Sequence, residues 1–253
     1  MKKITSWLTA IGFLVSAVLI TSSKVIAADT NVNAKASMDT AQFMSAYSNS
    51  QKPDTVIAEM NEILKINPTN AKAHYNRGTA YYEKQDFDAA ERDLSMAIKL
   101  EPKAADAYFN RGLSFRRRHK IDAAIFNFSK AIELYPKKPG YYFERANALI
   151  LKNDYSDAIA DASEAIRLSP QEPETYFLRG LALMLNDDLE RALADSIKAL
   201  QIDPDYTDAR RLLRETLLKI EMRQGSSSTH PCRSILRNKN VVNIPKNFSR
   251  ESE

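Results

Sequence analysis

Five prolines in this chain of 253 residues recur at a constant interval of 34 residues: Pro68, Pro102, Pro136, Pro170 and Pro204. Most of them follow an apolar-rich stretch with the character of a helix. Proline cannot continue a helix interior, because it lacks the backbone N–H and its ring clashes with the preceding turn. The interval therefore predicts a repeat of 34 residues that closes at each proline.

Alignment on the prolines gives four full units, 71–104, 105–138, 139–172 and 173–206. Each predicts two helices separated by a short break, and small residues at fixed positions let those helices approach closely. Asp86, Asp154 and Asp188 stand at the break as predicted N-caps of the second helix. Position 8 is Gly78, Gly112, Ala146 and Gly180; position 20 is Ala90, Ala124, Ala158 and Ala192; position 27 is Ala97, Ala131, Ala165 and Ala199.

The larger residues have fixed positions too, and together with the small ones they resemble the tetratricopeptide repeat family. That family's pattern has an aromatic at position 4, an aromatic or aliphatic residue at 11 and proline at 32. The departures are mild: His74 at position 4, and small Ala162 and Ser196 at position 24. The resemblance implies an all-α, right-handed α-solenoid of stacked helix-turn-helix units, since no single unit can bury its own apolar face.

Both ends of the repeat array are predicted to be caps. Residues 37–70 keep a second helix over 54–65 and Pro68, but the first half is degenerate. Residues 207–224 predict a capping helix whose apolar residues form one stripe, while its other side is rich in arginine. From Gly225 onward, residues 225–253 have the composition of a disordered basic tail.

The first 27 residues have the layout of a secretory signal peptide. Lys2 and Lys3 precede an apolar run of fourteen residues, 7–20, and small residues favour cleavage after Ala27. A membrane span needs about 20 apolar residues, so an uncleaved anchor is the less favoured alternative. The sequence thus predicts a bacterial periplasmic or secreted protein without a stable membrane span after cleavage, beginning with a flexible segment, 28–36.

The formal charge of +4 does not mark a nucleic-acid-binding protein, because of where the charges lie. The four repeats hold 20 basic and 22 acidic residues, so they carry a slight negative charge rather than a basic phosphate-binding face. The dense basic cluster at 116–120 falls at the end of a predicted first helix, where cations favour the negative end of the helix dipole. A docking patch for an acidic partner is the alternative interpretation.

The candidate site is the concave groove that first helices line in tetratricopeptide repeat proteins. The resemblance implies that positions 2, 5, 9 and 12 face the ligand, and position 5 is aromatic in every unit. Aromatic side chains supply much of the binding energy in interfaces, although packing between helices is an equally weighted role here. Neighbouring asparagines at position 6 add hydrogen-bonding groups. The predicted groove residues are Lys72, Tyr75, Asn76, Thr79, Tyr82, Phe109, Asn110, Arg111, Leu113, Arg116, Phe143, Asn147, Ile150, Phe177 and Leu181.

Arg111 belongs to a second pattern, an arginine at position 7 of all four units. Position 23 offers aspartate in three units and Asn127 in the other. Ion pairs between helices are the favoured interpretation. In either register one arginine faces Asn127, so Arg111 or Arg145 is predicted to be the least neutralised.

Catalytic, metal and cofactor sites have no support in the sequence. It contains no phosphate loop, nucleophile elbow or zinc-binding histidine pair, and Cys232 is the single cysteine. We expect a non-catalytic exported adaptor that binds a protein or peptide, with no cofactor, metal or nucleic acid. Two alternatives stay open: a self-associating structural envelope protein, including a homodimer, and a secreted factor that acts on a host protein.

Overall fold

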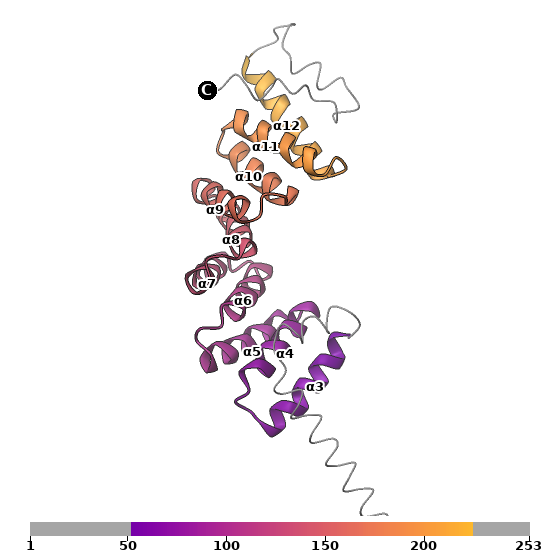
Figure 1. Cartoon of the computed structure of the whole chain (residues 1–253), viewed down its shortest axis with the longest axis vertical. Helices are drawn as coiled ribbons and strands as arrows, with labels where there is room; N and C mark the ends of the chain where they lie inside the picture. The colour runs from indigo at the N-terminus through magenta and orange to yellow at the C-terminus, as the bar shows by residue number, and fades with distance from the viewer. Residues whose placement is uncertain (1–51, 225–253) are drawn as a thin grey trace, which may run out of the picture. The chain divides into compact units, whose positions relative to one another are not determined.

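The computed structural model describes residues 52–224 of the chain (Figure 1). The described residues divide into two compact units, 52–102 and 103–224, and each is considered by itself below. Several predictions lie outside the described residues: the signal peptide over 1–27, the segment 28–36, the degenerate first half of 37–70, and the tail 225–253 with Cys232.

The described part of the chain is entirely helical, which confirms the predicted all-α fold class. In the first unit the helices are α3 (Pro53–Ile66), α4 (Ala71–Glu83) and α5 (Phe87–Leu100). In the second unit they are α6 (Ala105–Arg117), α7 (Ile121–Leu134), α8 (Pro139–Lys152), α9 (Tyr155–Leu168), α10 (Pro173–Leu185), α11 (Leu189–Ile202) and α12 (Thr207–Gln224). Between Lys52 and Gln224, no helix is both long and apolar enough to cross a membrane.

Two of the three predicted N-cap aspartates make a capping hydrogen bond. The Asp86 and Asp188 side chains accept hydrogen bonds from the backbone N–H groups of Ala89 (3.0 Å) and Arg191 (3.3 Å), as predicted for N-caps. Asp154 occupies the N-cap position of α9 but makes no such bond. The predicted N-cap position of Asp154 is therefore confirmed, but the capping hydrogen bond is absent. Oδ2 of Asp154 lies 3.7 Å from Nζ of Lys152.

The break between the two helices of each repeat contains a left-handed residue at position 15. These residues, with φ between 57° and 71°, are Gln85, His119, Asn153 and Asp187. None is glycine, although a side chain makes this conformation unfavourable for L-residues. The turn therefore carries some backbone strain in all four repeats.

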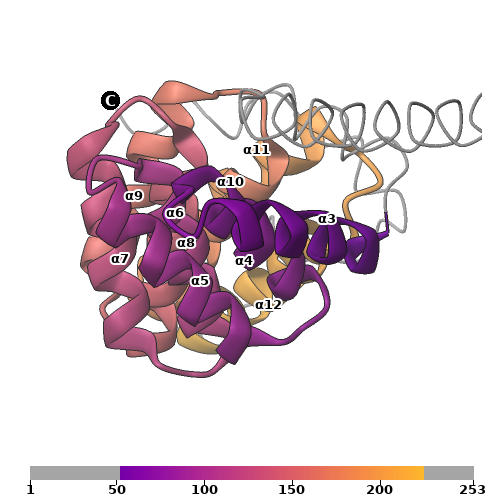
Figure 2. The same cartoon turned by 90° about the horizontal axis from the view of Figure 1, so that it is seen from below.

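In the second unit the helices pack as successive pairs, α6 with α7, α8 with α9, and α10 with α11. The first helices of the pairs also contact one another in series, α6 with α8, α8 with α10, and α10 with α12. Figure 2 shows α7 and α9 on one side of α6 and α8. The first helices of this unit thus form a layer of their own, with second helices behind it.

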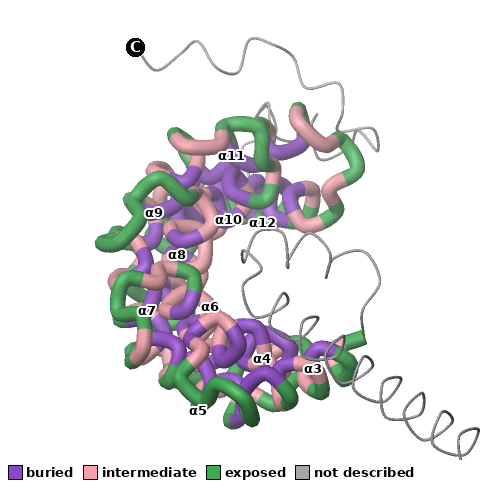
Figure 3. Tube along the Cα trace, turned by 60° about the horizontal axis from the view of Figure 1, so that its bottom comes forward, coloured by how far each residue is buried: buried purple, intermediate pink, exposed green. Residues whose placement is uncertain are grey.

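The buried residues gather where helices face each other (Figure 3). In the second unit the largest core cluster joins α10, α11 and α12, and the predicted stripe of the capping helix is buried in it. Ala209, Leu212, Leu213 and Leu217 are at most 2% exposed. A methyl group placed on Gly180 would lie 3.1 Å from Cδ2 of Leu212, so position 8 also sets how closely α12 approaches α10.

Candidate functional site

The predicted groove residues of the first unit lie on α4, but two of them are buried. Asn76 and Thr79 are 7% and 8% exposed, so the prediction that they line an open groove is wrong. Asn76 stands between Ala73 and Ala80 in helical spacing, and both alanines belong to the cluster that packs α4 against α3. Lys72, Tyr75 and Tyr82 are partly exposed.

The aromatic side chains at position 5 of the second unit pack between helices. The Phe109 ring centroid lies 5.7 Å from that of Phe128 and 4.9 Å from that of Tyr141, which belongs to the next repeat. The Phe177 ring meets that of Tyr206 edge-on at 5.6 Å. Phe143 packs against the cluster around Leu149. Each ring keeps a partly exposed surface, but packing is a role that the structure demonstrates.

Positions 9 and 12 of the second unit leave side chains partly exposed on the layer of first helices. We call this surface the first-helix face; its members are Leu113 on α6, Asn147 and Ile150 on α8, and Leu181 on α10. Because α6, α8 and α10 touch in series, these aliphatic and amide groups belong to one layer. Asn110, Arg111 and Arg116 on α6 are also partly exposed.

An ion pair connects α6 to α8 in this layer. Nη2 of Arg116 lies 3.0 Å from Oε2 of Glu144, and the two side chains are only 24% and 19% exposed. Burial raises the pKa of Glu144 above its ordinary value, while the positive charge of Arg116 acts in the opposite direction. Glu144 was not among the predicted site residues. It stands at position 6 of its repeat, the same position at which Asn76 and Asn110 were predicted to belong to the site.

Three of the four arginines at position 7 bind aspartate, as predicted, and each pair forms within one repeat, which is one of the two registers that the sequence left open. Arg145 donates from Nε and Nη2 to both carboxylate oxygens of Asp161, each at 2.7 Å, and Arg179 binds Asp195 in the same way. The third donor was not predicted: Nη1 of Arg145 reaches Oγ of Ser129 at 2.9 Å, in the preceding repeat. The guanidinium groups of Arg145 and Arg179 therefore each join two helices of their own repeat to the repeat before it.

Arg111 is the arginine that faces the odd asparagine. Its Nε donates to Oδ1 of Asn127 at 2.9 Å, and its guanidinium carbon lies 5.6 Å from the centroid of the Tyr108 ring. Pairing within the repeat thus places Asn127 opposite Arg111, while Arg145 pairs with Asp161.

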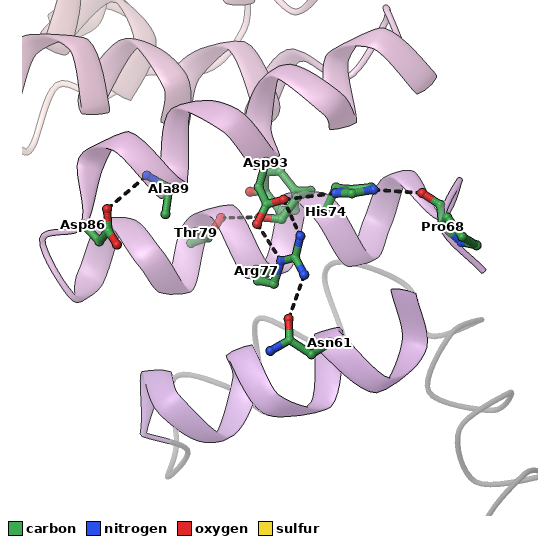
Figure 4. A network of polar contacts seen from close by, with 9 residues as sticks. Asn61, Pro68, His74, Arg77, Thr79, Asp86, Ala89 and Asp93 are labelled. Atoms are coloured by element: carbon green, nitrogen blue, oxygen red, sulfur yellow. Dashed lines mark hydrogen bonds and ion pairs between the residues drawn. The ribbon is translucent and has the colours of Figure 1, made fainter. Parts of the chain in front are cut away.

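In the first unit the corresponding network includes a histidine (Figure 4). Arg77 binds Asp93 through two donors and reaches Asn61 of α3 through Nη1 at 2.7 Å. Nδ1 of His74 lies 3.1 Å from Oδ1 of Asp93, and Nε2 lies 2.9 Å from the carbonyl oxygen of Pro68. His74 therefore fastens the repeat to the proline that precedes it, in the same way that the hydroxyl of Tyr176 donates to the carbonyl of Pro170 at 3.2 Å.

The basic cluster at 116–120 lies where the sequence placed it, at the end of α6. Arg117 is the last helical residue, Arg118 is the C-cap and His119 is in the left-handed turn. Arg116 forms an ion pair with Glu144, and Nζ of Lys120 lies 5.4 Å from the centroid of the Phe115 ring. The cluster therefore lies at a helix end, as the first of the two interpretations has it, and Arg116 is engaged within the protein. Within 52–224, no group of three His, Cys, Asp or Glu residues could hold a metal ion.

Comparison with known proteins agrees with this geometry. A sequence model of the tetratricopeptide repeat matches residues 75–139, 112–173 and 143–207, together more than half of the chain. No curated protein matches the chain significantly.

Several solved structures have the same fold at low identity. The structure of YrrB, described as a TPR protein with an unusual peptide-binding site, has a TM-score of 0.59 at 19% identity, over 68% of this chain and 87% of YrrB. A structure of MamA has a TM-score of 0.59 at 21% identity, over 67% and 98% of the two chains. MamA from Desulfovibrio magneticus RS-1 has a TM-score of 0.57 at 19% identity, over 59% and 85%. The repeat matches and the succession of helix pairs together show that this chain belongs to the tetratricopeptide repeat family.

Proposed function

We propose that this protein is an exported, non-catalytic scaffold that binds a protein or peptide on the first-helix face of its second unit. One observation carries the proposal: Leu113, Asn147, Ile150 and Leu181 are partly exposed on first helices that lie in one layer. Aliphatic groups offer apolar area to a partner, and an amide can donate to and accept from a peptide backbone.

The proposal has support from the kind of protein that shares the fold. YrrB, which is similar in structure, is described as having a peptide-binding site. In repeat proteins the extended surface formed by stacked units is a common binding surface. No catalytic constellation stands out in the sequence, so binding is the activity that the surface supports best.

The test is a substitution that blocks the face without disturbing the core. Asn147→Arg places a long charged side chain on α8, and Ser156→Arg places the same side chain at an exposed position of α9. The partner is first identified by cross-linking the tagged protein in its producing cell, followed by mass spectrometry. We expect the N147R protein to lose at least tenfold in affinity for that partner and the S156R protein to keep it. Equal affinity of the two folded variants would contradict the proposed surface.

Export rests on the signal-peptide pattern of residues 1–27. We expect the protein isolated from its producing cell to begin at Ala28 and to be found in the periplasm or the medium. N-terminal sequencing of the isolated protein, with fractionation of the cells, tests this. An intact N-terminus in a cytoplasmic fraction would reject export, and an intact N-terminus in a membrane fraction would favour an anchor.

Self-association is a second candidate function, and a feature of the capping helix favours it. Leu218 and Met222 of α12 are 44% and 82% exposed, and exposed apolar side chains on an end helix can pair with a second copy. Light scattering of the purified protein should then give a dimer that Leu218→Glu converts to a monomer. A monomer at all concentrations would remove this candidate.

A further inference from the structure

A cavity of about 380 Å³ opens between α7 and α9 in the second unit, with α8 as its floor. Such a volume is within the range of small binding sites. Its apolar wall is formed by Ile125, Leu149 and Ala160, and its polar wall by Ser129, Arg145, Asp157 and Asp161. None of these seven residues belongs to the first-helix face.

Two positions of α9 give the cavity its space and its charge, and α9 differs from every other second helix at one of them, position 19. Position 22 is Ala160, where the two preceding repeats have Arg92 and Phe126. Position 19 is Asp157, where the other repeats have Ala89, Ala123 and Arg191. The third repeat alone therefore combines a small residue that leaves space with a carboxylate that gives the space a charge.

The charge that remains in the cavity is negative. Asp161 is neutralised by Arg145, which also donates to Ser129. Within the described part of the chain, Asp157 has neither a hydrogen bond nor an ion pair through its side chain, although it is near enough to Arg145 for their charges to interact. Two carboxylates against one guanidinium leave one negative charge beside an apolar wall.

A cavity of similar size in the first unit lacks this property. It measures about 450 Å³ and is lined by Asn61, Glu62, Lys65 and Arg77, among others. There the carboxylate of Glu62 already accepts from Nζ of Lys65 at 2.6 Å. An uncompensated carboxylate thus distinguishes the cavity between α7 and α9.

We propose that the cavity between α7 and α9 is a second binding site, which accepts a lysine or arginine side chain of a partner protein. The aliphatic stem of such a side chain packs against Ile125, Leu149 and Ala160, and its cationic end pairs with Asp157. Long basic side chains commonly bury their stems along apolar surface in this way. The site goes beyond the proposed function, because it uses the second helices and can act with the first-helix face free or occupied.

The test uses two small probes that share a stem and differ in charge, N-acetyl-lysine amide and N-acetyl-norleucine amide. Each is titrated into the purified, isotope-labelled protein, and backbone amide signals are followed by NMR. We expect the lysine probe to shift the signals of residues 125, 129, 157 and 160 in a saturable manner, and the norleucine probe to leave them in place. Asp157→Asn should weaken the lysine probe about threefold, the size of one exposed ion pair, while Glu190→Gln, a control on α11, should not.

A filling variant tests the space itself. Ala160→Phe gives α9 the residue that α7 has at the same position and should abolish the shifts, whereas Ala194→Phe, at that position of the next repeat, should preserve them. Both alanines are exposed, so both proteins are expected to fold, which circular dichroism verifies. Three results would overturn the site: no shift with the lysine probe, equal shifts with the norleucine probe, or shifts that persist in folded A160F.

Discussion

Gly112 and Phe128 are matched in size across the two helices of their repeat. A Cβ atom on Gly112 would lie 2.7 Å from Cε1 of the fully buried Phe128 ring, and the space at Gly78 is limited in the same way by Leu94. In the third repeat the pair is Ala146 and Ala162, both buried. In this repeat the small residue at position 24 leaves room for the methyl group that alanine adds at position 8.

We therefore expect Gly112→Ala to lower the free energy of unfolding by about 1–3 kcal/mol, the usual effect of overpacking a core. In a Phe128→Ala background, the same Gly112→Ala change should lower it by much less, since the ring is gone. Chemical denaturation of the four proteins measures this cycle. Equal effects of Gly112→Ala in both backgrounds would show that the Phe128 ring does not limit position 8.

Asn127 interrupts an otherwise regular set of ion pairs, and restoring the pair should stabilise the protein. Asn127→Asp gives Arg111 the carboxylate that Arg145 and Arg179 have. Charge-assisted bidentate hydrogen bonds are roughly twice as strong as neutral ones, so we expect a gain of about 1 kcal/mol. The matched control is Asp161→Asn, which should be destabilising. Thermal unfolding at low and high salt measures both, and a loss of stability in N127D would contradict the account.

The left-handed residue at position 15 gives predictions of different size for two repeats. His119→Gly should stabilise the protein by about 1 kcal/mol, because glycine adopts a positive φ without the Cβ penalty. Asn153→Gly should change stability little, since asparagine tolerates this conformation better than most residues. Denaturation midpoints of the two variants provide the comparison; a larger gain at Asn153 than at His119 would refute the strain argument.

Tyr206 should control part of the stability at high pH. Burial, followed by the nearby charges of Glu174, Asp208 and Asp203, raises its pKa from 10.0 to about 12. The folded state therefore holds this proton more tightly than the unfolded state, so the stabilisation is complete below pH 10 and is lost as the pH rises toward 12.

Phenolate absorbance during an alkaline titration checks this prediction. Tyr206→Phe should remove an ionisation step near pH 12 and reduce the loss of stability over that interval. Tyr135→Phe, an exposed control, should leave the late step in place. A late step that survives in Y206F would assign it to another tyrosine.

The fold could be predicted from the sequence because its determinants are local and repeated. Proline at every thirty-fourth residue fixes where helices end, and alanine or glycine at positions 8, 20 and 27 fixes where they touch. The same alignment predicted that arginines at position 7 pair with aspartates at position 23, although the structure was needed to show that Arg145 pairs with Asp161 of its own repeat. These features depend on residue position within a repeat, which a single sequence shows directly.

The surface could be predicted less well, because exposure depends on neighbouring repeats. Asn76 is buried since α3 packs beside it, and the Phe109 ring packs against the ring of Tyr141 in the following repeat. The ion pair between Arg116 and Glu144 also joins two repeats, so it could not be predicted from the pattern within one repeat. The cavity beside Asp157 was missed because it depends on residues of three helices, α7, α8 and α9, whose combined effect appears only in three dimensions.

The central claim, that a partner binds the first-helix face, is tested most directly by photo-cross-linking in the producing cell. A photoreactive phenylalanine derivative replaces Asn147 or Leu113 on that face in one set of proteins, and Ser156 or Glu190 on second helices in another. The account predicts one shared cross-linked partner from the first set that is absent from the second. Cross-links to that partner from the second set, with none from Asn147 or Leu113, would contradict it.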